Sequence, residues 1–330
     1  MHLEHVEIPF ERFGLRHRHT RNVEDHARGF SGWEMRYNQV TPGLFEGSIT
    51  ELDLDGMQLI RDRANQAMVK SGQSWDGAVT FSLPLAAKDH SFYCDGRAIN
   101  VQSVLAGAGD QLPDLCTPAD VDLLCVAVDK SLLETMLAKQ QRDLRLDLNV
   151  VAGCFQLANF SCREELASLI NSVTDREGPG LLAHTAIRAG IRDTVLLHLL
   201  DLIDSEEVTP LSSTARKRIV DRACEFALSH RDNPPSIMDL CNHVGASRRK
   251  LQYCFQETLG VNPVAYLRIL RLNAVHRALL QADSTITVQD IAANWGFWHL
   301  SRFAAEYRQL FGERPSDTLS RARQYCADFG

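Results

Sequence analysis

The feature that most constrains this chain is an internal repeat in its last third. Residues 237–263 read IMDLCNHVGASRRKLQYCFQETLGVNP, and residues 288–315 read VQDIAANWGFWHLSRFAAEYRQLFGERP. The first halves of these segments match at an offset of 51 residues and the second halves at an offset of 52. The later copy therefore has one extra residue in its middle. A unit of this length that occurs twice indicates one supersecondary motif used in tandem.

Each copy predicts a helix-turn-helix motif, at residues 237–260 and 288–312. A short amphipathic helix is followed by Gly245 or Gly296, where the chain must reverse and a residue that tolerates positive φ is favoured. A second helix then carries apolar residues at i, i+4 and i+8 and ends at Gly and Pro. Ser247 is the expected N-cap of the second helix in the first copy.

The segment between the two copies predicts a linker helix from Pro263 to Leu280. It begins with Pro, which is favoured in the first turn of a helix, and keeps an apolar stripe. Eighteen helical residues span about 27 Å, close to the roughly 34 Å between successive major-groove faces of B-DNA. One chain is therefore expected to place two recognition helices in adjacent major grooves of double-stranded DNA.

The distribution of charge supports a nucleic-acid partner for the last third alone. From Thr214 onward the chain has 16 Lys and Arg against 11 Asp and Glu, a net charge of +5. The first 213 residues have 19 against 31, a net charge of −12. A basic region that coincides with tandem helix-turn-helix motifs indicates binding to the DNA backbone.

Residues 212–321, with both motifs and the linker helix, closely resemble the DNA-binding domain of the AraC/XylS family of bacterial transcription regulators. The wording GVNPVAYLRILRLNAVHRALL is also similar to the branch that regulates ethanolamine operons. The resemblance implies an N-terminal domain that senses a small molecule, a homodimer, and contact with RNA polymerase if the protein activates transcription, which is the family's commoner mode. The residues themselves do not separate an activator from a repressor.

The predicted fold class is α+β in two domains. Residues 43–128 hold short alternating runs split by Gly, Asp and Pro, which predict a β-rich sandwich or barrel. Helical periodicity follows at residues 130–140, 163–175 and 181–203, and the last two helices are expected to mediate dimerisation. The third helix is apolar enough to need a partner helix, from this chain or from a second copy.

The segment EEVTPLSST holds Pro, Ser and Thr between two helical patterns and is the best candidate for a linker. The predicted division is therefore a regulatory and dimerisation domain at residues 1–205, a linker at 206–213 and a DNA-binding domain at 214–330.

The resemblance assigns base reading to the first turn of each recognition helix. In the first motif Arg249 and Gln252 are the main candidates, because Arg pairs with guanine and Gln with adenine through two hydrogen bonds. Arg248 and Tyr253 are further candidates, and Lys250 is expected on phosphate. A phosphate contact is the alternative for each of these side chains.

The second recognition helix departs from this pattern. The four matching positions offer one hydroxyl among them: Leu300, Ser301, Ala304 and Ala305. The side chains expected to hold the DNA backbone are His299, Ser301, Arg302 and Arg308, while a Leu300 methyl group can meet a thymine methyl. We therefore predict that the first motif supplies most of the specificity and the second mostly affinity.

The aromatic side chains of the second motif divide into two kinds. Most follow helical spacing and are expected in the core: Trp295, Phe297, Phe303, Tyr307 and Phe311. Trp298, at the turn, is retained as a candidate DNA contact.

Other kinds of site are set aside. His17-Arg18-His19 has the spacing of a metal-binding barrel, but no Glu and His follow suitably and it precedes the predicted strands. No metal and no cofactor are expected. Nucleophile-elbow, P-loop and dinucleotide-binding motifs are lacking, which argues against an enzyme.

The expected location is the bacterial cytoplasm, on the nucleoid. No apolar stretch approaches the roughly 20 residues of a membrane span, and the N-terminus has no signal-peptide pattern. The nine cysteines are scattered in an odd number, which suits a reducing compartment. Two alternatives stay open for the N-terminal domain: a module that only dimerises or binds a protein, and an enzyme fused to a DNA-binding tail.

Overall fold

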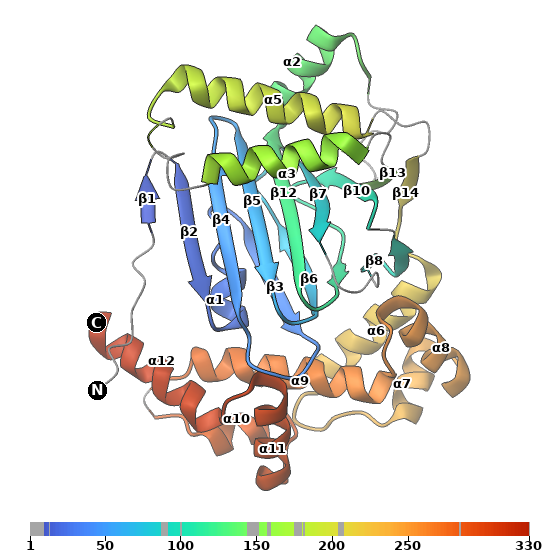
Figure 1. The fold of residues 1–330 in the computed structure, drawn as a ribbon. Coiled ribbons are helices and arrows are strands. Elements are labelled where there is room, and N and C mark those ends of the chain that lie inside the picture. The colour runs from blue at the N-terminus through green and yellow to red at the C-terminus, as the bar shows by residue number, and fades with distance from the viewer. Residues whose placement is uncertain are drawn as a thin grey trace.

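The structure, a computed structural model, describes residues 10–12, 14–86, 92–99, 101–143, 152–156, 160–174, 180, 182–203, 208–283 and 285–329. A β-rich N-terminal domain lies against a helical C-terminal domain, and helix α9 runs along the boundary between them (Figure 1).

The N-terminal domain contains two antiparallel sheets. The larger sheet has the order β1-β2-β4-β5-β12-β7-β10-β13-β14, and the smaller has the order β3-β6-β11-β8-β9. The strands of the larger sheet are β1 (Phe10–Arg12), β2 (Leu15–Thr20), β4 (Gly47–Asp53), β5 (Met57–Ala64), β7 (Ala78–Ala86), β10 (Ser103–Ala108), β12 (Val121–Asp129), β13 (Ala152–Gln156) and β14 (Val208–Leu211). Those of the smaller sheet are β3 (Glu34–Gln39), β6 (Met68–Gln73), β8 (Phe92–Cys94), β9 (Arg97–Ile99) and β11 (Leu115–Thr117).

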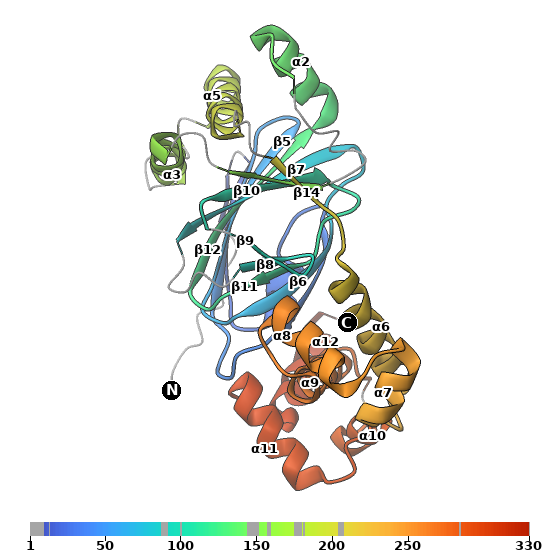
Figure 2. The same cartoon turned by 90° about the vertical axis from the view of Figure 1, so that its right-hand side faces the viewer.

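The larger sheet separates two apolar cores, because successive side chains of a strand point to opposite faces. In β12, Leu123 and Cys125 belong to the core between the two sheets. Leu124 and Val126 belong to the core on the opposite face. That face is covered by α2 (Lys130–Gln140), α3 (Phe160–Thr174) and α5 (Thr185–Ile203). Helices α3 and α5 lie side by side across the sheet (Figures 1 and 2).

The predicted α+β class is confirmed, and the β-rich region is wider than expected. Strands β2 and β3 and the short helix α1 (Val23–Ala27) precede residue 43, where the alternating pattern was expected to begin. The apolar stripe of α5 has its partners in this chain, because its buried leucines pack into the core shared with α3 and the larger sheet. His17-Arg18-His19 lies on β2, so the expectation that it precedes the strands is wrong.

Part of the predicted linker at residues 206–213 belongs to the sheet. Val208–Leu211 forms β14, which pairs with β13, and Leu211 is buried. Pro210 was the signal for a linker, but β14 is the edge strand of the larger sheet. A proline is tolerated at an edge because its missing N–H breaks no ladder there. The segment therefore anchors the chain to the N-terminal domain before the C-terminal helices begin.

The C-terminal domain consists of helices packed around two apolar cores. The helices are α6 (Ala215–Ser229), α7 (Ile237–Val244), α8 (Arg248–Leu259), α9 (Pro263–Leu280), α10 (Val288–Asn294), α11 (Leu300–Phe311) and α12 (Pro315–Phe329). One core joins α6, α7, α8 and the start of α9, and the other joins the end of α9 with α10, α11 and α12. The two predicted helix-turn-helix motifs and the linker helix are confirmed. Among the described helices, none combines the length and apolar character of a membrane span.

Candidate nucleic-acid interface

The first motif is built from α7 and α8, and local sequence fixes both ends of α7. Ser236 and Asp239 form a capping box, in which the side-chain oxygen of each residue accepts from the backbone N–H of the other. The same Ser236 hydrogen bonds hold the pKa of Asp239 below its ordinary value. Gly245 ends α7 with φ of 69°, a left-handed conformation that glycine adopts without a steric penalty.

Helix α8 presents a basic and amide face to solvent. Ser247 caps it, as predicted, by accepting from the N–H of Lys250 at 3.2 Å. The buried face consists of Leu251, Cys254, Phe255 and Thr258, at the i, i+3, i+4 and i+7 spacing of one helix side. The opposite face is exposed and holds all the residues predicted to touch DNA in this motif: Arg248, Arg249, Lys250, Gln252 and Tyr253.

The cations of α8 are available for an anionic partner. Within the described part of the chain, Arg248 and Arg249 form no ion pair, so both guanidinium groups point outward uncompensated. The Lys250 ammonium lies 5.6 Å from the centre of the Tyr253 ring, and the Arg216 guanidinium lies 6.0 Å from it. Tyr253 therefore sits between two cations, an arrangement in which the ring face is attracted to both.

The second motif repeats this framework with α10 and α11. Thr287 and Asp290 form the capping box of α10, and Gly296 adopts φ of 72° in the turn. Helix α11 has twelve residues, like α8, and ends at Gly312 as α8 ends at Gly260. Four of the five aromatic side chains expected in the core are buried, and Trp295 is partly buried against them: Phe297, Phe303, Tyr307 and Phe311.

The exposed face of α11 differs from that of α8. Trp298 and Leu300 are 68% and 39% exposed, and they form an apolar start to the helix. His299 is the N-cap residue but its side chain makes no capping hydrogen bond, unlike Ser247. The other residues predicted to touch DNA here are exposed too: His299, Ser301, Arg302 and Arg308. Arg302 donates to Glu306 at 2.9 Å, so it is partly neutralised.

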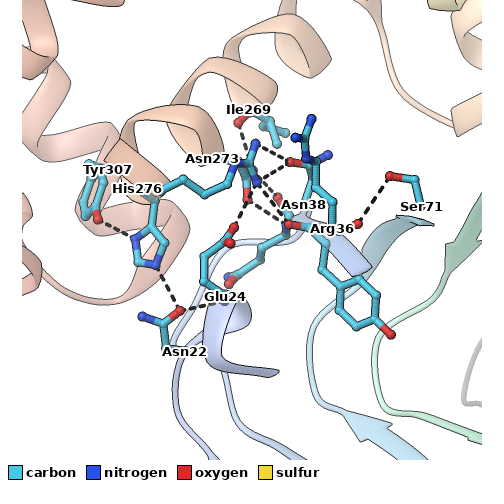
Figure 3. A network of polar contacts seen from close by, with 12 residues as sticks. Asn22, Glu24, Arg36, Asn38, Ser71, Ile269, Asn273, His276 and Tyr307 are labelled. Carbon is cyan, nitrogen blue, oxygen red and sulfur yellow. Dashed lines mark hydrogen bonds and ion pairs between the residues drawn. The ribbon is translucent and has the colours of Figure 1, made fainter. Parts of the chain in front are cut away.

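Sequence reasoning missed a polar face of α9 that contacts the N-terminal domain. Asn273, His276 and Arg277 lie on one side of this helix, at i, i+3 and i+4, and reach residues more than 230 positions away in the sequence (Figure 3). The available signal was the presence of polar side chains in a helix expected to carry only an apolar stripe. Their partners lie too far along the chain for any local pattern to reveal.

A cavity lies between the two sheets of the N-terminal domain. Its volume is about 50 Å³. Aromatic and aliphatic side chains dominate its walls, with Phe30, Trp33 and Tyr37 on one side. The cation at the wall is Lys70, which is buried and donates to Asp62 at 2.6 Å.

Asp62 joins Lys70 to a buried polar network. Its carboxylate also accepts from Tyr37 Oη at 3.1 Å and lies 2.9 Å from His26 Nε2. Burial raises the pKa of Asp62, but the charges and hydrogen bonds of Lys70 and His26 outweigh that effect and hold the pKa well below its usual range. In the described residues, no three side chains of the His, Cys, Asp or Glu type gather as a metal site.

Two exposed recognition helices on one rigid linker helix define a DNA-binding transcription regulator. A family model described as a helix-turn-helix domain matches residues 240–321. A transcriptional activator of the XylDLEGF operon from Pseudomonas putida is 32% identical over 139 residues, which cover 40% of this chain and 88% of that protein. This chain belongs to the AraC/XylS family of transcription regulators.

Two further proteins resemble the chain. A probable regulatory protein of the thc operon from Rhodococcus erythropolis is 30% identical over 208 residues, 62% of each chain. The matched part is thus less than two thirds of that protein. A solved structure of a probable AraC family regulator from Rhodopseudomonas palustris is 34% identical, with a TM-score of 0.30 over 32% of this chain and 97% of that one. None of these bears on the ethanolamine branch, which stays a prediction.

Proposed function

We propose that this regulator activates transcription in response to a small molecule that binds between the two sheets of its N-terminal domain. The observation that carries the proposal is the cavity, which has convergent aromatic walls and one buried cation. Concave, mostly apolar sites with a few placed polar groups are the usual form of a small-molecule site. The P. putida relative named as a transcriptional activator supports activation over repression.

The charges at the cavity favour an uncharged ligand. Asp62 already neutralises Lys70 at 2.6 Å, so a second anion would have to compete with a buried carboxylate. An ammonium has three N–H donors, and the carboxylate of Asp62 takes one of them. A carbonyl or hydroxyl oxygen of the ligand can accept from another. We therefore expect a small aromatic compound with one neutral acceptor.

The size of the cavity implies that binding moves its walls. The cavity has a volume of about 50 Å³, whereas a cavity that binds benzene measures about 150 Å³. An aromatic ring must therefore push apart side chains that line the space, among them Met35 and Tyr37 of β3. Ligand binding is therefore expected to displace β3.

The other parts of the proposal concern partners. We expect a homodimer, contact with RNA polymerase at promoters, and action on the nucleoid in the cytoplasm. The apolar stripe of α5 packs inside its own chain, so we expect the dimer to use the outward faces of α3 and α5. The ten predicted DNA contacts are proposed to act as assigned above, with base reading concentrated at Arg249 and Gln252.

The test is a thermal-shift screen of the full chain against small aromatic compounds. The full chain is needed because β14, at residues 208–211, completes the larger sheet. A ligand at 100 times its Kd stabilises the state that binds it by about 2.7 kcal/mol, so a true effector raises the melting temperature saturably. The Lys70→Met variant should lose that response while its DNA binding stays.

A screen without any stabilising compound would favour the rival, an N-terminal domain that only dimerises or binds a protein. The second rival, an enzyme fused to a DNA-binding tail, is tested by metal analysis of the purified chain. Stoichiometric zinc or iron would support that rival and contradict our assignment.

A further inference from the structure

The two helix-turn-helix motifs have separate apolar cores, so their relative placement depends on what joins them. Helix α9 contributes Leu267 and Leu270 to the first core and Leu272 and Val275 to the second. The turn of the second motif also contacts the loop between α6 and α7, where Gly296 packs against Pro234.

The N-terminal domain contacts the first half of the C-terminal domain through an ion pair. Lys217 of α6 is 7% exposed, and its ammonium donates to Asp114 of the N-terminal domain at 2.7 Å. The same ammonium contacts Asp221 on its own helix. Gly96, in the turn between β8 and β9, packs so closely on α8 that an added Cβ would lie 2.8 Å from Thr258 Cγ2. The first motif is thus held at α6 and α8.

The N-terminal domain contacts the second half at the end of its recognition helix. The last carbonyl groups of a helix have no partner within it. In α11, Gly43 N–H donates to the carbonyls of Gln309 and Leu310, at 3.1 and 3.0 Å. Gln39 Nε2 donates to the Leu310 carbonyl as well, at 2.6 Å. The N-terminal domain therefore supplies the hydrogen-bond donors that complete α11.

Between these two contacts, the N-terminal domain holds α9 itself (Figure 3). The Asn273 carboxamide accepts from Gln39 N–H and donates to Gln39 O, both at 2.9 Å, and so pairs with the strand end as another peptide group would. Arg277 pairs with Glu24 at 3.0 Å and donates through both terminal nitrogens to Asn38 Oδ1. Two separate helix positions are thereby fixed to one strand.

We propose that the N-terminal domain is a brace that fixes the distance and angle between the two recognition helices. The N-terminal domain contacts α6 and α8 of the first half, α11 of the second half, and α9 between them. A brace of this kind makes the protein selective for the spacing of the two half-sites on DNA, because each motif must enter its major groove in the correct phase.

Strand β3 links this brace to the cavity. Met35 and Tyr37 line the cavity, and Tyr37, Asn38 and Gln39 hold α9. Neighbouring residues of a strand are about 3.3 Å apart, so a displaced Tyr37 lies within roughly 7 Å of the Gln39 joint. This link rests on the effector function proposed above, whereas the brace itself does not.

The test uses ligand-free full-length protein and a DNA duplex that the protein selects from a random library. Duplexes with one base pair added or removed between the half-sites are then compared with the parent by fluorescence anisotropy. The wild type should lose about tenfold or more in affinity on the altered duplexes, because contacts to one half-site are lost. In Asn273→Ala and Glu24→Gln the difference should shrink below about threefold.

Val264→Ala is the matched control, because Val264 lies on the same helix and its side chain is exposed to solvent. It should keep the selectivity for spacing. Hydrogen exchange at the Gln39 amide checks that the brace is open, since that N–H loses its acceptor in Asn273→Ala. Variants that fold, expose the Gln39 amide and still discriminate spacing as the wild type does would overturn the brace.

The link through β3 has its own variant. Ser82 lines the cavity on the sheet opposite β3, and Ser82→Leu fills part of the space without a ligand. It should raise exchange at the Gln39 amide and reduce the selectivity for spacing. No change in either measurement would overturn the link and leave the brace. Failure to find an effector would contradict the proposed function alone, because neither measurement requires one.

Discussion

The two helix-turn-helix motifs share a framework and differ in what they show to DNA. Helices α8 and α11 have twelve residues each, end at a left-handed glycine and bury an apolar face. The first begins with Arg248, Arg249 and Lys250, and the second with Leu300, Ser301 and Arg302. Buried residues and caps thus fix the motif, while the exposed first turn is free to diverge. One fold can therefore carry two different tasks.

The largest expected effects are equal in the two motifs, because both cores are fully packed. Phe255 in the first core is 0% exposed, and Phe303 in the second core is 1% exposed. Replacing either with alanine should lower the free energy of unfolding by about 3 to 5 kcal/mol. Chemical denaturation of each variant measures the loss. A cost below about 1 kcal/mol at one site only would mean that the cores are not equivalent.

The next largest expected effect is on base recognition, which should be lost on substitution in the first motif and nearly unchanged in the second. Arg249→Ala should cost about 1 to 3 kcal/mol in binding and relax preference at about one base pair, since a bidentate contact with guanine is lost. Ser301→Ala, at the matching position, should change binding far less. The measurement is titration of each variant with duplexes that carry single base substitutions. A larger specificity loss in Ser301→Ala than in Arg249→Ala would reverse our division of roles.

Acid should weaken the second motif before the first. His276 joins α9 to Tyr307 at 2.6 Å, and burial lowers its pKa to about 3. The unfolded chain, with a histidine pKa near 6.5, binds more protons below that pH, so stability falls as pH falls. The loss at pH 5 is about 2 kcal/mol. Among the described residues, no histidine of α6, α7 or α8 is buried.

The control for this prediction is His276→Gln, which cannot take up a proton. Unfolding free energies at pH 7.5 and pH 5 should differ by about 2 kcal/mol less in the variant than in the wild type. Identical pH dependence in the two proteins would show that His276 titrates normally.

The smallest effect concerns the backbone contacts of the second motif. Arg302 is exposed and pairs with Glu306, which also pairs with Arg268. We expect Arg302 to add the same amount to the binding free energy for every DNA sequence. Arg302→Ala should weaken binding to specific and random duplexes alike and reduce the slope of log K against log salt by about 1. Binding at four salt concentrations measures that slope. A loss confined to one sequence would make Arg302 a base reader.

The sequence allowed a close prediction of the C-terminal domain. Pro263 begins the linker helix, Ser247 and Gly260 bound the first recognition helix, and Gly312 ends the second, because caps and breakers act within a few residues. The aromatic core followed from helical spacing alone. The unequal first turns could also be read directly, since exposed side chains need no partner to be recognised.

The N-terminal domain was predicted only in outline. Strand order, the cavity and the edge strand at 208–211 depend on pairings between distant residues, and Pro210 was misread because edge position is not a local property. The contact of Asn273 with Gln39 spans 234 residues. No periodicity within α9 specifies that partner, so this part of the account required the structure.

The most direct test of unequal motifs is a complete set of single base substitutions across the wild-type binding site. Each duplex is titrated at one fixed salt concentration. The half-site under α8 is identified as the one that contains the base pair at which Arg249→Ala loses its preference. We predict losses of about 1 to 3 kcal/mol per substitution at several positions in that half-site, and losses within a few tenths at most positions under α11. Equal losses in the two half-sites, or larger losses under α11, would contradict the account.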